Sequence, residues 1–376
     1  MSKKSFLTAL CAVSLCAILL FSGTNLSEGI RRGLFLCSYS VIPALFPFMA
    51  LSVFICRSSA AEFFSKLFRP ITKLLKIPEN CGGILLAAAI GGYPAAAKCI
   101  NDSVCGGFLD RKTASKMLCF CVNAGPPFLI SAVGIGVFGS IRTGFLLFAA
   151  QFLSSSIIAV LISCFSKKPE TCREHYSPIY RSNSALIVES IISAAESCFR
   201  MCAFIVIACG VLEISFGGAV FGFAENKPLL KAIFSGFFEI TAGVFSCAEI
   251  EGLAASVIAA GTIASFSGIS VILQVAAVTE ESKIPLFPFI VSRFFHAGIT
   301  AAILRIFFAF SKDTAAVFSA NGGSVEAVLS ASAPAAVSML CMASLFLLSV
   351  VPPKTEKEGV LSRIWNKFNI FWHSQT

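Results

Sequence analysis

Apolar segments long enough to cross a lipid bilayer recur along most of this 376-residue chain. A membrane-spanning helix needs about 20 apolar residues. The segments predicted to cross are residues 5–22, 33–56, 116–138, 143–165, 199–214, 252–279, 285–310 and 334–351. Because 56% of the residues are hydrophobic and only 13% are charged, an ordinary soluble domain is excluded. The sequence therefore predicts an all-α, polytopic membrane protein with about eight transmembrane helices.

Two further apolar segments are each interrupted near the middle. Residues 81–105 form two arms on either side of "GGYP", and residues 228–250 form two arms around "FFEITAG". An arm of about ten residues spans roughly 15 Å as a helix, which is half of a bilayer core. This length predicts two re-entrant hairpins, although a kinked crossing helix would use the same residues. The basic links at 57–78, 106–115 and 166–183 share one side only if residues 81–105 re-enter, so the positive-inside rule favours the hairpin.

The order of crossing helix, hairpin, broken helix and crossing helix occurs twice. "NAGPP" at 123–127 interrupts the first broken helix, and "SFSGIS" at 265–270 interrupts the second. A unit of three crossings and one hairpin has an odd number of crossings, so its second copy must be inverted. Inverted repeats with paired discontinuous helices are typical of secondary transporters, whose binding sites lie near the membrane midplane.

This organisation divides the chain into six parts. They are an N-terminal transmembrane anchor (1–29), a first repeat (30–165), a cytoplasmic linker (166–185), a second, inverted repeat (186–310), an extracytoplasmic loop with a last transmembrane helix (311–353), and an amphipathic tail (354–376). Apolar residues three or four apart around Arg363 and Lys367 indicate that the tail lies on the cytoplasmic membrane surface. Both termini are predicted to be cytoplasmic, and membrane lipids are expected partners.

The residue patterns of enzymes, metal sites and nucleotide sites are missing from the sequence. "GGYPAAAK" resembles a phosphate-binding loop, but Ala97 and Cys99 stand where that loop needs a glycine and a hydroxyl. The three histidines are too far apart for a metal pair, and the 16 cysteines are scattered as packing residues are. The net charge is +9, and the lysines and arginines that give rise to it lie mainly in the links between apolar segments. We therefore expect no enzyme, no cofactor, no metal and no nucleic-acid partner.

The helix interruptions predict where a substrate binds. Unwound backbone at membrane depth must be satisfied by water, by protein or by a polar ligand. Lys98 follows the break in "GGYPAAAK" and offers a fixed positive charge to an anion, although an ion pair with Asp102 is the alternative. The predicted substrate-binding residues are Gly91, Gly92, Tyr93, Pro94, Lys98, Asn123, Gly125, Pro126, Ser267 and Gly268.

A second group of polar residues is predicted to take part in ion coupling. A charged side chain at membrane depth costs about 2.5–3.5 kcal/mol on insertion scales, so it is expected to face a partner or a wet cavity. Glu239 is either a proton or sodium ligand or a capping partner of Thr241. Arg293 and His296 share a helical face, and Arg293 either lies in the site or reaches to the membrane interface.

Five short segments carry a family resemblance. "FPFMALS", "GGYPAAAK", "NAGPPF", "FEITAG" and "SFSGIS", in this order and spacing, resemble the YlbJ family of sporulation integral membrane proteins, also called SpoVV. The resemblance covers residues 30–310 and implies that both repeats are Gate-like, after the nucleoside-recognition Gate domain shared with concentrative nucleoside transporters. Ala96 and Val122 depart from the family pattern, which commonly has glycine and asparagine there, and this difference bears on substrate selectivity.

The same resemblance implies a function. It is the export of dipicolinic acid from the mother cell across the outer forespore membrane of a bacterium. Dipicolinate is a small planar dianion, for which a lysine at a broken helix is a suitable partner. A proton or a sodium ion is the candidate coupling ion, and a homo-oligomer is left open. The alternatives are a transporter of nucleosides or related molecules and a spore-envelope assembly factor that transports nothing.

Overall fold

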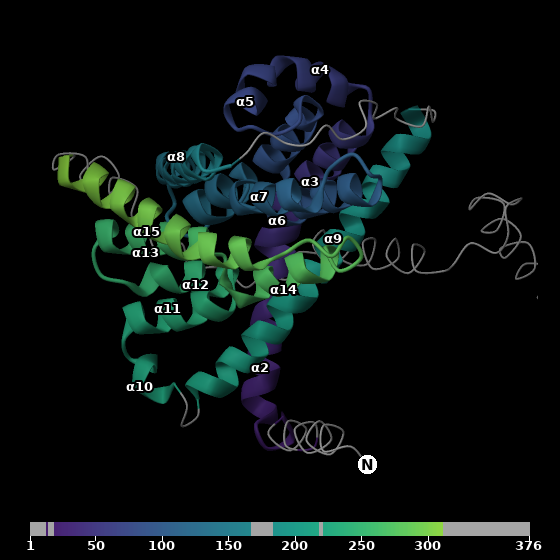
Figure 1. Ribbon diagram of the computed structural model, residues 1–376. Coiled ribbons are helices and arrows are strands. Elements are labelled where there is room, and N and C mark those ends of the chain that lie inside the picture. The colour runs from purple at the N-terminus through teal and green to yellow at the C-terminus, as the bar shows by residue number, and fades with distance from the viewer. Residues whose placement is uncertain (1–12, 14–18, 167–182, 218–220, 311–376) are drawn as a thin grey trace, which may run out of the picture.

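The computed structural model describes residues 13, 19–166, 183–217 and 221–310, and within them it contains helices and no strand (Figure 1). Six helical stretches of this part are long and apolar enough to cross a membrane. They are Gly23–Arg57, Glu79–Cys105, Ile141–Cys164, Ala185–Phe216, Leu253–Val278 and Phe287–Phe310. The prediction of an all-α polytopic membrane protein is therefore confirmed. The predicted crossings at 5–22, for the most part, and at 334–351, and the tail at 354–376, lie outside the described residues, so the count of eight stays a prediction.

The first repeat begins with one long helical stretch, because α2 continues through a π-helical turn into α3. Short helices on the basic link, a folded helix and a broken helix follow. The elements are α2 (Gly23–Leu36), the turn Cys37–Val41, α3 (Ile42–Arg57), α4 (Ala60–Leu67), α5 (Arg69–Leu74), a 3-10 turn (Glu79–Cys81), α6 (Gly82–Cys105), α7 (Arg111–Cys121), a π-helix (Pro127–Ile135) and α8 (Ile141–Cys164).

The elements of the predicted second repeat follow a similar coarse order, although one short helix stands where the first has α4 and α5. They are α9 (Asn183–Phe216), α10 (Gly222–Glu225), α11 (Pro228–Phe238), α12 (Ile240–Ser246), a 3-10 turn (Cys247–Glu249), α13 (Leu253–Phe266), α14 (Gly268–Val278) and α15 (Phe287–Phe310). The sequence predicted a crossing at 199–214 after a linker at 166–185. In the structure this crossing belongs to one 34-residue helix, α9, whose N-terminal half contains no proline that would interrupt it.

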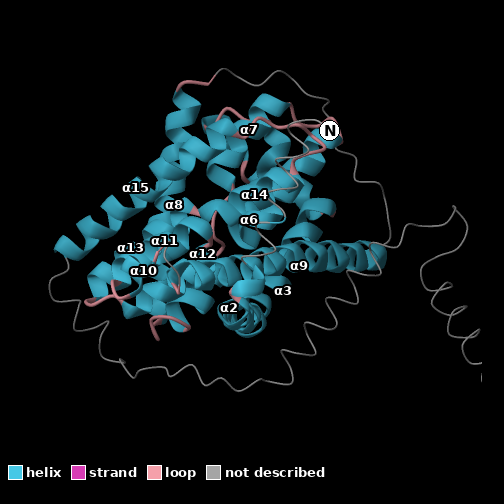
Figure 2. Cartoon of the chain, turned by 90° about the horizontal axis from the view of Figure 1, so that it is seen from below, coloured by secondary structure: helices cyan, strands magenta, loops and turns pink. Residues whose placement is uncertain are grey.

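Helices α2 and α9 pack closely against each other, and Figure 2 shows α9 lying across the bundle with α2 seen nearly end-on. Glycines allow this approach. A Cβ atom on Gly29 would lie 2.5 Å from the carbonyl oxygen of Cys209, and one on Gly33 would lie 2.8 Å from Cα of Val206. Small residues at such contacts let two helix backbones approach in a membrane, where apolar burial gives little drive for association.

Helix α6 folds back on itself at Gly92. This residue has φ 72° and ψ −156°, a conformation that is essentially restricted to glycine. Near the end of α3, Cys56 Sγ lies 3.7 Å from the carbonyl oxygen of Gly83, while the next residue, Arg57, pairs with Asp102 at 3.1 Å. A straight helix would place residues 83 and 102 about 28 Å apart. Both ends of α6 therefore return to the same end of α3.

Helices α11 and α12 form a second hairpin, with Glu239 between them in extended conformation. A Cβ atom on Gly243 would lie only 2.2 Å from Cα of Gly236, so the two arms touch through their glycines. At the open end, Lys231 Nζ pairs with Glu249 Oε2 at 3.0 Å. Both interrupted segments of the sequence are thus two-armed in the structure, and their re-entry into a membrane from one side stays a prediction.

Contacts join the described links to the start of α7 and to the ends of α6 and α8, and Ser166 is the last described residue at the start of the third link. Arg57 pairs with Asp102 near the end of α6, Lys76 Nζ donates to the carbonyl oxygen of Ser166 at 3.0 Å, and Lys116 Nζ donates to that of Leu75.

We therefore expect epitope tags placed singly in links 57–78, 106–115 and 166–183 to be labelled from the cytoplasmic side alone. The measurement is antibody labelling before and after permeabilisation. Opposite labelling of the first two links would show that residues 81–105 cross the membrane.

Candidate functional site

Each hairpin tip packs against the helix break that follows it in the chain. A Cβ atom on Gly92 would lie 3.0 Å from the backbone nitrogen of Gly125, in the first break. A Cβ atom on Gly268, in the second break, would lie 2.9 Å from the carbonyl oxygen of Gly236 and 3.3 Å from the backbone nitrogen of Ile240. The predicted pairing of hairpins with broken helices is therefore present in both repeats, and backbone meets backbone at each contact.

A small cavity of about 20 Å³ lies between the two hairpin tips. Its lining comes from both repeats and from the long helices α3 and α9. The residues are Val41, Leu45, Gly91, Gly92, Tyr93, Pro94, Gly125, Phe128, Met201, Ile205, Glu239, Ile240, Thr241, Val271 and Gln274. This volume accommodates about one water molecule. The cavity brings together five of the predicted substrate-binding residues and two of the predicted ion-coupling residues.

The first break follows from three consecutive residues that oppose a helix. Helix α7 ends at Cys121, Gly125 and Pro126 follow, and the π-helix begins at Pro127. Proline disfavours the helical conformation of the residue before it and lacks the N–H of a helix bond. Asn123 Nδ2 donates to the carbonyl oxygen of Phe120 at 2.6 Å and so satisfies one of the carbonyl groups freed at the end of α7. Pro126, half-buried, precedes the π-helix.

Arg293 on α15 reaches the first break from the second repeat. Its Nη1 donates to the carbonyl oxygen of Val122 at 2.6 Å, and its Nη2 donates to that of Cys119. The side chain is 0% exposed. The alternative that Arg293 reaches to the membrane interface is therefore wrong.

Tyr93 makes the reciprocal contact from the first repeat to the second. Its hydroxyl donates to the carbonyl oxygen of Ala264 at 2.6 Å, in the last turn of α13. Ser267, which follows α13, is fully buried and has φ 79°, and Gly268 starts α14. Each break is thus held by a side chain from the other repeat, and moving one repeat against the other would disturb both breaks.

Glu239 lies at the tip of the second hairpin and is almost fully buried, with 1% exposure. One carboxylate oxygen, Oε2, accepts a hydrogen bond from the backbone nitrogen of Ala242 at 2.7 Å. Glu239 therefore caps α12, and the bond goes to Ala242, whereas the predicted capping partner was Thr241. Among the described residues, no lysine, arginine or histidine forms a salt bridge with Glu239. The carboxylate therefore keeps the capacity to bind a proton or an ion.

A buried polar network between α8, α13 and α15 was missed by sequence reasoning. Thr300 hydrogen-bonds Ser154 at 2.7 Å and Ser265 at 2.8 Å. His296 Nε2 lies 3.2 Å from the carbonyl oxygen of Gln151. A usable signal existed, because residues 293, 296 and 300 repeat at helical spacing on one face.

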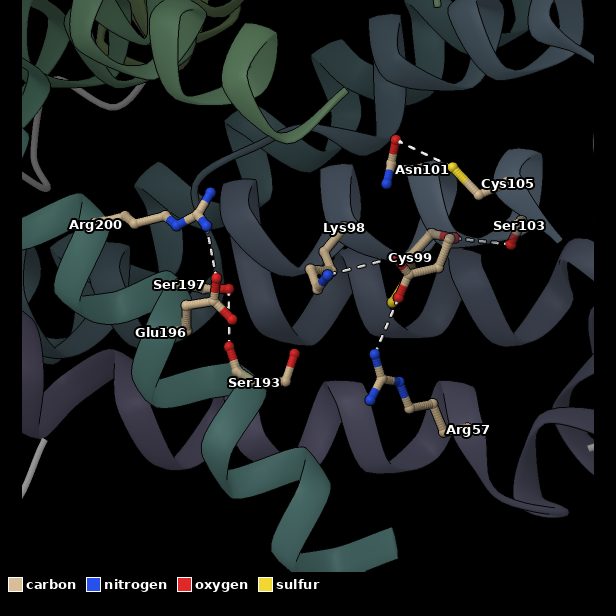
Figure 3. A network of polar contacts seen from close by, with 11 residues as sticks. Arg57, Lys98, Cys99, Asn101, Ser103, Cys105, Ser193, Glu196, Ser197 and Arg200 are labelled. Carbon is tan, nitrogen blue, oxygen red and sulfur yellow. Dashed lines mark hydrogen bonds and ion pairs between the residues drawn. The ribbon is translucent and has the colours of Figure 1, made fainter. Parts of the chain in front are cut away.

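Lys98 does not reach the tip cavity. Its Nζ lies 3.5 Å from Oδ1 of Asp102, whose other oxygen is bound by Arg57, so the ion pair considered as the alternative is formed. Figure 3 shows Lys98 on α6 near Arg57 of α3, with Glu196 and Arg200 of α9 on the other side. Lys98 lines two larger cavities, of about 140 Å³ and about 360 Å³. It therefore lies outside the tip cavity, and its side chain is 29% exposed.

Comparison with known proteins gives one similarity. The chain is 24% identical over 309 residues to the sporulation integral membrane protein YlbJ of Bacillus subtilis (strain 168). The aligned region covers 73% of this chain and 76% of that protein. No family model and no solved structure matches the chain. The similarity supports the YlbJ-like resemblance of the five motifs and agrees with the apolar, helical structure of an integral membrane protein.

Proposed function

We propose that this chain is a sporulation membrane transporter that exports a small organic anion, dipicolinic acid, from the mother cell across the outer forespore membrane. The observation that carries the proposal is the cavity between two hairpin tips, each packed on a broken helix. Broken helices of this kind expose backbone groups at the midplane, where secondary transporters bind their substrates. The sporulation setting is supported by the name of the Bacillus relative.

Transport through this arrangement requires the tips to separate. The tip cavity of about 20 Å³ holds about one water molecule, whereas a planar dicarboxylate with an aromatic ring needs several times that space. Gly92 and Gly125 present backbone without side chains, so movement there would open polar groups to a ligand. The closed arrangement therefore corresponds to a state in which neither side of the membrane has access.

Lys98 is the proposed first carboxylate partner. It borders both cavities beside α6, and Asp102 already has Arg57 as a second cationic partner. An arriving carboxylate can therefore bind the lysine while Asp102 keeps an ion pair. Arg57, Lys98 and Asp102 give the smaller cavity, of about 140 Å³, a net charge of +1, which favours an anion there. The larger cavity also holds Glu196, Glu280 and Glu281, so the smaller one is the proposed place of first contact.

The test is transport by the purified protein in proteoliposomes. We expect uptake of labelled dipicolinate and much weaker uptake of uridine. Lys98→Met should insert normally and reduce dipicolinate transport by about tenfold or more, which corresponds to roughly 1.4 kcal/mol of lost transition-state stabilisation. Lys98→Arg keeps the charge and should retain part of the rate, because a planar fork replaces a compact ammonium group.

The outcomes separate the competing functions. Preference for uridine would favour a nucleoside transporter. An assembly factor would be favoured if neither compound were transported and if cells with Lys98→Met sporulated as well as cells with the parent protein. Parental dipicolinate transport by Lys98→Met would reduce Lys98 to an ion-pair partner of Asp102.

A further inference from the structure

The carbonyl groups at the end of α7 form an electronegative environment that favours a positively charged partner. The last carbonyl groups of a helix have no partner within it, and together they form the negative end of the helix dipole. At this end the peptide after Cys121 leaves the helix, with Val122 at φ −85° and ψ 89°. Unwound carbonyls and half-helix C-terminal ends of this kind bind cations in membrane transporters.

Arg293 supplies that positive charge from within the chain. Its two terminal nitrogens donate to the carbonyl oxygens of Val122 and Cys119, and Nη1 also lies 3.5 Å from Oδ1 of Asn123. The guanidinium carbon stands 4.9 Å from the centre of the Phe289 ring, which adds a cation–π contact. All of these contacts suit a positive group.

No carboxylate balances Arg293 among the residues that the structure describes. No salt bridge of Arg293 occurs there, and the buried carboxylate of Glu239 caps α12 in the second hairpin instead. A lone buried cation is costly unless dipoles surround it. The carbonyl oxygens of the break are therefore what makes its burial possible.

The second break differs in charge. The oxygen of Ala264 accepts a hydrogen bond from the neutral hydroxyl of Tyr93 at 2.6 Å. The two breaks have matching places in the two predicted repeats, but among the described residues a cationic side chain holds the first and none holds the second. The charged donor therefore serves one break, where it is fully enclosed.

We infer that Arg293 is a tethered cation that fills the cation position of the first helix break, so that this break binds no sodium ion from solution. The guanidinium fork matches two carbonyl oxygens at once, which a single metal ion would otherwise bridge. The position itself rests on geometry alone. The consequence for ion coupling rests on the proposed function. It is that no sodium ion bound at this break drives transport.

The test removes the tethered cation and offers a free one. Arg293→Ala, purified in detergent, is expected to melt below the parent protein. Methylguanidinium chloride should raise the melting temperature of this variant relative to choline chloride at equal ionic strength, because it can donate to the vacated carbonyls. The parent protein should show no such difference between the two salts, nor between sodium chloride and choline chloride. Arg305→Ala removes an exposed arginine of the same helix and is the matched control.

The inference is overturned if Arg293→Ala responds to the salts as the parent and Arg305→Ala do. Two further variants serve if Arg293→Ala does not fold. Arg293→Lys keeps the charge and should fold, whereas Arg293→Gln keeps a donor without charge and should be less stable than Arg293→Lys. Stability of Arg293→Gln equal to or above that of Arg293→Lys would refute a need for charge.

Transport measurements then address the coupling separately. Replacing sodium by choline should leave dipicolinate transport by the parent protein unchanged, and a loss of transport would refute the coupling part. If the parent protein transports no dipicolinate under any salt, the proposed function fails. The melting result of Arg293→Ala would still stand or fall by itself.

Discussion

Gly243→Ala is expected to prevent the second hairpin from closing and to leave little correctly folded protein. The new Cβ atom would lie 2.2 Å from Cα of Gly236 and 2.4 Å from its backbone nitrogen. Both are backbone atoms, which cannot move aside as a flexible side chain can. We expect a cost at the upper end of the roughly 1–3 kcal/mol of overpacking, or beyond it. The measurements are yield of monodisperse protein and melting temperature in detergent.

Gly298→Ala is the matched control for this change. Gly298 lies in α15, and a Cβ atom added to it would have no neighbouring atom within 4 Å, so the methyl group meets open space. Alanine within a helix should be neutral or should stabilise by about 0.5–1 kcal/mol. A Gly243→Ala protein that melts with the parent and with Gly298→Ala would show that the arms do not pack through these two glycines.

The interruptions of the helices could be predicted from the sequence because glycine and proline act locally. "GGYP" and "NAGPP" change direction for reasons that lie within a few residues. The half-length arms also follow from counting apolar residues against bilayer thickness. The bounds of α9 were predicted less well, because the crossing predicted at 199–214 covers only the apolar part of a 34-residue helix. A change from polar to apolar residues near 198 alters the exposed face of a helix without breaking it.

The contacts between the repeats could not be predicted in this way. Tyr93 and Ala264 are 171 residues apart, and Arg293 and Val122 are also 171 residues apart. Such pairs depend on how two repeats pack, which local propensity does not encode. Lys98 is the opposite case, because Asp102 stands four residues later on the same helix, and the ion pair was a visible alternative.

A buried charged residue therefore indicates a functional position better than a charged residue near a helix break does. Lys98 is partly exposed and paired, whereas Arg293 and Glu239 are enclosed without a partner of opposite charge among the described residues. A membrane protein keeps such groups only where dipoles or a functional cycle compensate their cost. Arg293 has the carbonyl dipoles of the first break, and this leaves Glu239 as the buried acid of the tip cavity.

Glu239→Gln is expected to reduce dipicolinate transport by about tenfold or more, or roughly 1.4 kcal/mol in the rate-limiting step, and to remove its dependence on pH. The carboxylate lines the cavity between the tips, where an ionised acid would repel an arriving dianion. A proton on Glu239 would relieve this repulsion, so substrate and proton would occupy the cavity together. Glutamine mimics the protonated acid but cannot release the proton, and the cycle stops. Initial rates in proteoliposomes across a series of pH values measure the effect.

Two comparisons separate this coupling role from the capping role of Glu239. Glutamine retains a side-chain oxygen for the backbone nitrogen of Ala242, so Glu239→Gln should fold, whereas Glu239→Ala should lose about 1 kcal/mol with the cap. Glu249→Gln changes an exposed acid at the open end of the same hairpin and should keep the parental pH profile. If Glu239→Gln lowered the melting temperature while its remaining transport kept the parental response to pH, the carboxylate would be a helix cap alone. A flat pH profile in Glu239→Gln with a parental profile in Glu249→Gln would instead place the coupling proton on the hairpin tip.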